Sequence, residues 1–328
     1  MHRVHITPAA CAIALVLAVT GTARVQSAGA VRFDEFAPTT FSVITPDVRK
    51  LAAAWADVLG IAAPPVNQPE VVYPPVFEGD RNGRPTMVSM QMANMTLSMH
   101  QPPEGRNYWR QTLDAQGEAL YRMNFRVHDL ADQVAYFERK GGTLVIGDPA
   151  KVPYVNVNLW ARYGVALELN GVAAGAPPQG PRPAAPAGSF AANPVVKIAF
   201  VVPDLDKAIA DYADLFGLSA ASAVRTNPEV MLPVSTGATA RLARATLTFP
   251  NGVLLELNRP PDGKNVWQDH LRRHGRSIFS VGFRVSSVPD ASAYLRSKGG
   301  VPAFGVPTAT YAGFDFTSKL GTVIEIQQ

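Results

Sequence analysis

The chain has 328 residues, of which 47% are apolar and 17% charged, and its formal net charge is +4. The length predicts about two domains, and the apolar fraction excludes a disordered chain. The single cysteine, Cys11, excludes a disulfide framework and a cysteine metal cluster.

The first thirty residues have the features of an export signal. A short basic start precedes an apolar run over residues 9–19, and small residues at 28–30 offer a cleavage site. The run is shorter than the roughly 20 residues that span a bilayer, although an uncleaved membrane anchor is the alternative. We expect removal of residues 1–30 and a secreted or periplasmic protein. Its 28 basic and 26 acidic residues would give no reason to expect nucleic acid or a membrane as a partner.

The rest of the sequence is a duplication. Residues 41–60 (FSVITPDVRKLAAAWADVLG) return as residues 198–217 (IAFVVPDLDKAIADYADLFG), and later residues recur at the same offset of 157 or 158. A fixed offset along the chain indicates a repeated structural unit. We expect one domain over residues 38–171 and a second over 195–328, joined by a linker rich in proline, alanine and glycine over 172–194.

Each copy predicts strands and helices in the same order. In the second copy a strand ends at Pro203, Asp204 can cap the following helix, and Gly217 can stop it. Short strands, a strand over 278–285, a helix over 288–298 and a strand over 322–327 follow. Apolar and polar residues alternate along these strands, so one sheet face lies under the helices. The polar face is either simply solvated or curled around a cleft.

These stretches resemble the vicinal oxygen chelate superfamily, which includes glyoxalases, extradiol dioxygenases and bleomycin-resistance proteins. The resemblance rests on residues 201–218, 254–275, 281–285 and 320–328 together with their counterparts in the first copy. It implies an α+β fold of two tandem glyoxalase-like domains. Each would be a pair of βαβββ modules that form a half-barrel around a cleft.

The resemblance also implies four metal-ligand positions in each domain, usually two histidines and two glutamates or glutamines. These positions hold Thr40, Ser98, Arg122 and Glu168 in the first domain, and Lys197, Glu256, Ser280 and Glu325 in the second. None is a histidine, and two carboxylates are fewer than the three or four ligands that hold a catalytic ion such as zinc. We therefore expect no metal cofactor; a divalent ion on an unusual ligand set is the alternative.

The charges at these positions indicate what would replace the metal. A Lys197 ammonium between Glu256 and Glu325 would relieve their repulsion, and Arg122 would pair with Glu168 in the first domain. The alternative is that these charges point to solvent and never meet.

Further polar residues lie on the same strand faces. Asn124, Asn258 and Arg284 extend the candidate cleft, and His100 is a candidate general base because imidazole titrates near neutrality. His270 and His274 have a spacing that can hold zinc, but without the glutamate of an HExxH motif we expect them on a solvated helix face.

Two functions remain open at this stage. The first is a protein that binds a small organic molecule in the cleft, with salt bridges in place of the metal site. The second is an enzyme, a lyase, isomerase or dioxygenase-like protein, that uses Lys197, Glu256 and Glu325 or an atypical metal. For either function we expect a small-molecule partner and a monomer with its two domains packed together.

Overall fold

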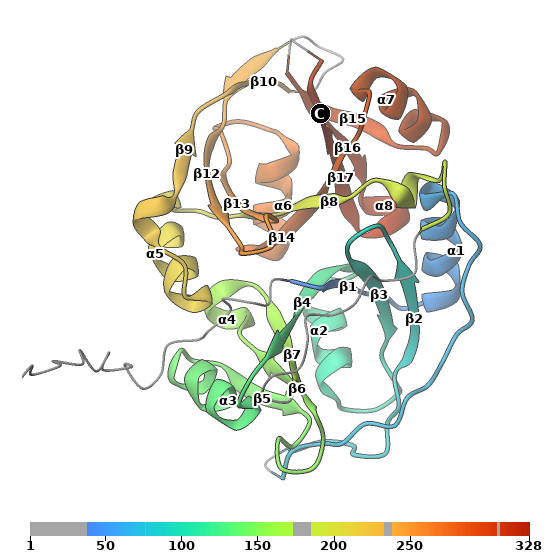
Figure 1. Ribbon diagram of the computed structural model, residues 1–328, viewed down its shortest axis with the longest axis vertical. Coiled ribbons are helices and arrows are strands. Elements are labelled where there is room, and N and C mark those ends of the chain that lie inside the picture. Colours follow the sequence, from blue (N-terminus) through green and yellow to red (C-terminus); the bar gives the residue numbers. More distant parts are fainter. Residues whose placement is uncertain (1–37, 76, 173–184, 233–237, 307–308) are drawn as a thin grey trace, which may run out of the picture.

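The computed structural model describes residues 38–75, 77–172, 185–232, 238–306 and 309–328 (Figure 1). The predicted export signal over 1–30 and much of the predicted linker lie outside these residues. Within the described part of the chain, no helix is long and apolar enough to cross a membrane.

The first domain is one curved sheet with its helices. Its elements are β1 (Thr40–Ile44), α1 (Val48–Leu59), β2 (Thr86–Gln91), β3 (Thr96–Gln101), α2 (Tyr108–Gln116), β4 (Ala119–Val127), α3 (Leu130–Arg139), β5 (Thr143–Ile146), β6 (Tyr154–Asn158), α4 (Trp160–Tyr163) and β7 (Ala166–Gly171). The strand order is β2-β3-β1-β4-β7-β6-β5. The two halves meet where β1 and β4 pair antiparallel.

The second domain repeats this plan with additional edge strands. Its elements are η1 (Phe190–Ala192), β8 (Val195–Val201), α5 (Leu205–Phe216), η2 (Ala220–Ser222), β9 (Val224–Thr226), β10 (Glu229–Met231), β11 (Thr239–Arg241), β12 (Ala243–Thr248), β13 (Leu254–Arg259), α6 (Val266–His274), β14 (Ser277–Arg284), α7 (Val288–Ser297), β15 (Val301–Gly305), β16 (Tyr311–Phe316), α8 (Thr317–Leu320) and β17 (Thr322–Gln327). The strand order is β11-β10-β15-β16-β17-β14-β8-β13-β12-β9. The α+β fold of two tandem half-barrels is thus confirmed.

Equivalent residues start and stop the first helix of each domain. The Asp47 carboxylate accepts a hydrogen bond from the Lys50 amide, and the Asp204 carboxylate accepts one from the Lys207 amide, both at 3.0 Å. Such side-chain caps satisfy amide groups that the first helical turn leaves unpaired. The glycine that ends each helix adopts the left-handed conformation expected of a C-terminal stop.

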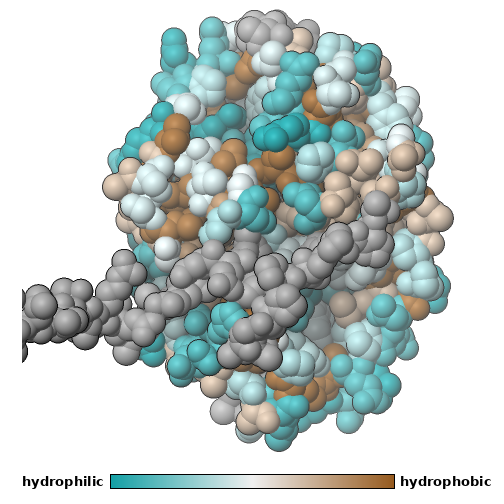
Figure 2. All heavy atoms as spheres, viewed as in Figure 1, coloured by the Kyte–Doolittle hydropathy of each residue, from teal (hydrophilic) through white to brown (hydrophobic). Residues whose placement is uncertain are grey.

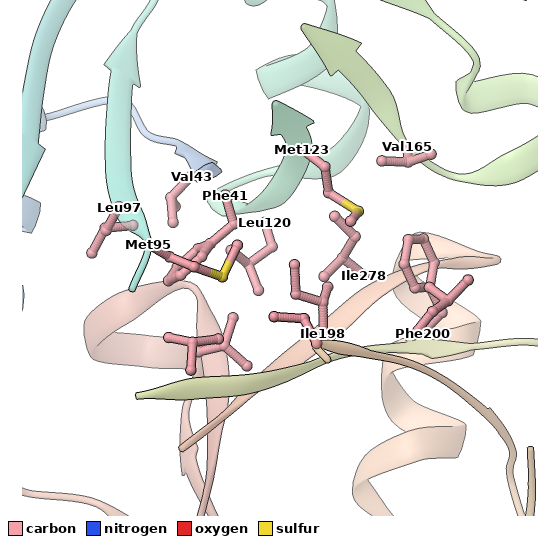
Figure 3. Close-up of a cluster of buried hydrophobic side chains, with 14 of the residues drawn as sticks. Phe41, Val43, Met95, Leu97, Leu120, Met123, Val165, Ile198, Phe200 and Ile278 are labelled. Atoms are coloured by element: carbon pink, nitrogen blue, oxygen red, sulfur yellow. The ribbon is translucent and has the colours of Figure 1, made fainter. Parts of the chain in front are cut away.

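The two sheets pack against each other through apolar side chains. Phe41, Met123, Ile198, Phe200 and Ile278 belong to one buried cluster that spans both domains (Figure 3). The opposite face of each sheet curves around a helix, α2 in the first domain and α6 in the second (Figure 1). Each domain therefore has its own interior.

The end of the predicted linker packs against the second domain. Phe190 is the only aromatic residue of this segment, and it is buried against the rings of Phe283 and Tyr294. Ala191 beside it is also buried, and its carbonyl oxygen accepts a hydrogen bond from the Ala93 amide of the first domain at 3.0 Å. The end of the linker therefore contacts both domains.

Ion pairs related by the duplication connect the domains at their surface. Asp57 of α1 is 2.7 Å from Lys298 in the second domain, and Asp214 of α5 is 2.6 Å from Lys140 in the first. On the face shown in Figure 2, hydrophilic side chains are spread over both domains, with apolar ones between them. The domains thus contact each other through symmetric edges as well as through the shared core.

We predict that replacing Gly164 with a larger residue destabilises the protein, because the two domains approach each other closely at this position. Gly164 has a φ of +64°, and a Cβ there would lie 1.7 Å from the carbonyl oxygen of Arg276. The left-handed conformation alone costs a residue with a Cβ about 1–2 kcal/mol, so Gly164→Ala should lower the free energy of unfolding by roughly 3 kcal/mol or more once the overlap is added. Gly141→Ala is the control, because Gly141 has a φ of +91° and open space around it. Equal losses in urea denaturation would contradict the prediction.

Candidate functional site

Lys197 of β8 lies at the centre of a buried polar cluster in the second domain. Its Nζ is 3.1 Å from Glu256 Oε2 and 2.5 Å from Glu325 Oε2, and the three side chains are at most 3% exposed. Gly282 on the neighbouring β14 leaves room for the lysine, since a Cβ at this position would lie 2.4 Å from Lys197 Cγ. The ammonium therefore bridges two carboxylates from different halves of the sheet.

Additional donors complete the hydrogen bonding of the two carboxylates. Asn258 Nδ2 donates to Glu256 Oε1 at 2.9 Å, and Arg244 Nε lies 3.4 Å from Glu256 Oε2. The hydroxyls of Ser280 and Tyr311 donate to the two oxygens of Glu325. Each carboxylate oxygen thus has a donor. Two cations balance two anions, which is the condition under which buried charges are tolerated.

The charges of this cluster support one another. Burial alone would raise the pKa of Glu256, but the Lys197 ammonium and the Arg244 guanidinium outweigh it and lower that pKa. Burial, together with the nearby Glu325, raises the pKa of Tyr311 well above its ordinary value. The carboxylate of Glu256 is therefore held ionised and the Tyr311 hydroxyl is held neutral.

The first domain contains a second cluster, built around Arg122 of β4. Its Nη1 is 2.8 Å from Glu168 Oε2 and donates to Asn156 Oδ1 at 3.1 Å. Its Nη2 lies 3.2 Å from His100 Nε2, which must then accept, so the His100 Nδ1 proton faces the Tyr121 hydroxyl 2.7 Å away. This cluster links a histidine and a carboxylate through one guanidinium.

His100 is fully enclosed by this cluster. The side chain is 0% exposed, and both of its ring nitrogens have hydrogen-bond partners. Burial, reinforced by the charge of Arg122, holds the pKa of His100 well below its ordinary value. To act as a general base on a ligand, the imidazole would need the cluster to open.

Most of the residues predicted from the sequence are brought together in one cluster or the other. Ser98 contacts His100 at 3.0 Å, and Asn124 Nδ2 donates to Glu168 Oε1 at 2.8 Å. Two predicted cleft residues lie apart. Among the described residues, the half-buried Thr40 side chain and the exposed Arg284 side chain form no hydrogen bond or ion pair with either cluster, although Thr40 is the cross-strand neighbour of Asn124.

Several contributors were missed from the sequence: Tyr121, Asn156, Arg244 and Tyr311. Tyr311 could have been found, because Tyr154 precedes it by 157 residues and lies at the start of the corresponding strand, β6. Arg244 has no such signal, since it enters the cluster from β12, where the two copies differ.

The residues at the implied metal position do not fit a divalent ion. In the second domain the lysine ammonium already fills the space between the two carboxylates, and in the first domain a guanidinium contacts the one carboxylate. Across the described ranges, no three His, Cys, Asp or Glu side chains are grouped so that they could hold a metal. Nitrogen cations donate hydrogen bonds and offer no lone pair to a metal.

An open cavity lies elsewhere in the second domain, between α6 and the β15–β16 pair. Its volume is about 440 Å³, and His270 and His274 line it. The expectation that both histidines lie on a solvated helix face is wrong for His270. Its Nε2 is 2.8 Å from Ser277 Oγ and its ring packs edge-to-face on Phe279, because α6 turns this face toward the sheet.

Comparisons with known proteins agree with this architecture. Residues 197–317 match the family described as the Glyoxalase/Bleomycin resistance protein/Dioxygenase superfamily. A mutant of 4-hydroxymandelate synthase from Streptomyces coelicolor is similar in structure, with a TM-score of 0.57 and 12% identity over 88% of this chain and 91% of that one.

A second solved structure is similar at a lower score. It is 2,2',3-trihydroxybiphenyl 1,2-dioxygenase from the dibenzofuran-degrading Sphingomonas wittichii strain RW1, with 14% identity, 88% of this chain and 89% of that one covered, and a TM-score of 0.48. A search of curated protein sequences finds no match. At these identities the similarity concerns the fold alone.

We predict that Lys197→Met destabilises the protein strongly, because two buried carboxylates would lose the cation between them. Removing one partner of a buried ion pair costs about 3–5 kcal/mol. The matched control is Lys140→Met, which breaks a pair of similar length with Asp214 at the surface and should cost about 1 kcal/mol or less. Chemical denaturation at pH 7 measures both losses, and an equal loss would show that the ammonium does not hold the carboxylates.

We also predict that His100 makes the folded protein sensitive to acid. The pKa of His100 is lowered in the folded state. As the pH falls through about 6.5, this histidine therefore becomes protonated in the unfolded chain but stays neutral in the folded chain. The free energy of unfolding should therefore fall as the pH drops from about 7 to 5. His100→Asn should have a shallower slope over this range, with its packing loss read separately at pH 8. An unchanged slope would contradict the prediction.

Proposed function

We propose that this chain, whose residues 197–317 match the Glyoxalase/Bleomycin resistance protein/Dioxygenase superfamily, binds a small organic molecule and that buried ion pairs replace the family's metal site. The position of the Lys197 ammonium carries this proposal. It lies 3.1 Å and 2.5 Å from the two carboxylates at the implied ligand positions.

The charge of the cluster supports a replacement of the metal. Lys197 and Arg244 together supply two positive charges beside Glu256 and Glu325, the same charge that a divalent ion would bring. Every carboxylate oxygen already accepts a hydrogen bond or pairs with a cation, so a metal would have to displace the lysine. Such a satisfied cluster is suited to holding the fold and the shape of the interior rather than to binding an ion.

The proposal includes where the protein acts and in what form. The basic start, apolar run and small residues over positions 1–30 support export to a secreted or periplasmic location. The apolar core shared by both domains, with ion pairs at its edges, supports a monomer whose two halves are packed together. The near-balance of charge supports a small molecule as the partner, rather than a nucleic acid or membrane.

An enzyme is the second candidate, and one observation favours it. Tyr311 lines another cavity, of about 300 Å³, and its hydroxyl lies 3.4 Å from Lys197 Nζ. A substrate in that cavity would reach the cluster through this hydroxyl, and Lys197, Glu256 and Glu325 would then serve as acid and base groups. Turnover abolished by Tyr311→Phe in a folded protein would favour this candidate over binding alone.

A ligand screen with and without chelator tests the proposed function. We expect small organic molecules to raise the melting temperature equally in EDTA and in added Zn²⁺ or Mn²⁺, because the ligand site needs no metal. We also expect Zn²⁺ titration of the wild-type protein to give no binding heat. One tightly bound metal equivalent in the purified protein, or ligand stabilisation that EDTA abolishes, would contradict the proposal.

A rebuilt metal site provides the matched comparison. Lys197→His with Ser280→His would place two histidines beside Glu256 and Glu325, the ligand set that the resemblance implies, and should bind one equivalent of Zn²⁺. Ser280→His alone keeps the ammonium and should not bind. Zinc binding by this single variant would show that Lys197 does not block the position.

A further inference from the structure

We propose that the cavity between α6 and the β15–β16 pair of the second domain binds an organic monocarboxylate with an apolar body the size of two fused rings. The inference rests on the proposed binding function and assigns its ligand site. The site is distinct from the buried Lys197 cluster.

The cavity has the size and lining of a small-molecule site. Its volume of about 440 Å³ lies in the range of roughly 300–1,000 Å³ typical of such sites. Phe279, Val266 and Pro302 give it apolar walls, while Val301 at its edge is 63% exposed. Val301 is one of two large apolar side chains that the described residues leave this exposed. A ligand with an apolar body would cover it.

The charges around the cavity favour an anion. Lys264 and Arg273 both line it, and neither has a carboxylate partner among the described residues. The two acids of the lining are already engaged: Asp269 pairs with Arg272 at 2.8 Å, and Asp315 Oδ1 accepts hydrogen bonds from the amide and hydroxyl of Thr317. Within the described ranges, the lining therefore has two cations without an ion-pair partner, Lys264 and Arg273, against one carboxylate, Asp315, that accepts hydrogen bonds but pairs with no cation.

The two histidines add polar groups without adding charge. Burial, then the neighbouring His274 and Arg273, lowers the pKa of His270 to about 3. Burial and Arg273 also lower the pKa of His274, which a backbone hydrogen bond from the ring to Gln116 only partly offsets. At neutral pH the positive charge at this site thus belongs to Lys264 and Arg273, whose longer side chains are more exposed.

Three residues that line the cavity are smaller than their counterparts in the first domain. At the positions of Val266, Ala303 and Thr317, the first domain has the larger residues Tyr108, Val145 and Trp160. There Tyr108 belongs to a buried apolar cluster, and the partly buried Val145 and Trp160 pack against it.

The polar residues of the lining differ between the domains in the same way. Arg273, His270 and His274 correspond to Ala115, Thr112 and Gln116 in the first domain. The basic Lys264 has a counterpart in Arg106, whereas Arg273 and the two histidines occur with the smaller side chains in the second domain only.

The duplication also supplies the variants that test the site. The probes are 2-naphthoate and its neutral analogue 2-naphthamide, titrated into the full chain by calorimetry. We expect wild-type protein to bind the carboxylate about 10-fold more tightly, the effect of one charge-assisted contact. Lys264→Met with Arg273→Met should remove this preference and leave naphthamide binding unchanged. Val266→Tyr with Thr317→Trp, which copies the first domain, should abolish binding of both probes.

Two controls make the outcomes decisive. Arg49→Met with Lys50→Met removes the same charge from the exposed face of α1 and should keep the preference. Circular dichroism and the melting temperature of each variant show whether it is folded. If the variant Val266→Tyr with Thr317→Trp does not fold, Ala303→Val, which introduces the first-domain residue, takes its place. This variant should weaken the binding of both probes.

Each remaining result counts against the cavity. No naphthoate binding at millimolar concentration, or an equal affinity for the two probes, would overturn the inference. If the folded variant Val266→Tyr with Thr317→Trp still binds naphthoate, the inference is also overturned. The proposed binding function would then stand, because the ligand would lie elsewhere. Failure of every organic molecule in the chelator screen would instead refute the proposed function itself.

Discussion

A buried ammonium between two buried carboxylates constrains the whole second domain. Glu256 and Glu325 come from strands in different halves of the sheet, and their mutual repulsion would otherwise oppose the curl that brings them together. Lys197 joins them, while Arg244, Tyr311, Asn258 and Ser280 satisfy the remaining oxygens. A buried ion pair adds little net stability over an apolar replacement, but a broken one costs several kcal/mol. The cluster therefore adds little net stability when intact, and losing one of its members is costly.

The two domains share one order of strands and helices, but the side chains on the concave faces of their sheets differ. Because the sheets share an apolar core, each concave face is free to change without disturbing the other. The first domain has a guanidinium, Arg122, where the second has Ser280, and encloses His100 within its cluster. Large side chains pack beside α2 in the first domain, whereas the second domain has a cavity beside α6.

The repeat made the architecture predictable, because a fixed offset, a cap such as Asp204 and a stop such as Gly217 each depend on local sequence alone. The resemblance to the vicinal oxygen chelate superfamily placed Lys197, Glu256 and Glu325 at the implied metal-ligand positions, and the offset gave their counterparts in the first domain. Alternation could not show whether these charges meet or face solvent, because that depends on how far the sheet curls. Arg244 was missed since it arrives from a strand that differs between the copies, and the burial of His270 depends on the docking angle of α6.

A crystal structure grown with Mn²⁺ or Zn²⁺, with anomalous data collected at the metal edge, tests the central claim most directly. The account predicts no anomalous peak between Glu256 and Glu325, and a Lys197 Nζ within hydrogen-bonding distance of both carboxylates. A metal ion at that position, with the lysine side chain displaced from it, would contradict the account.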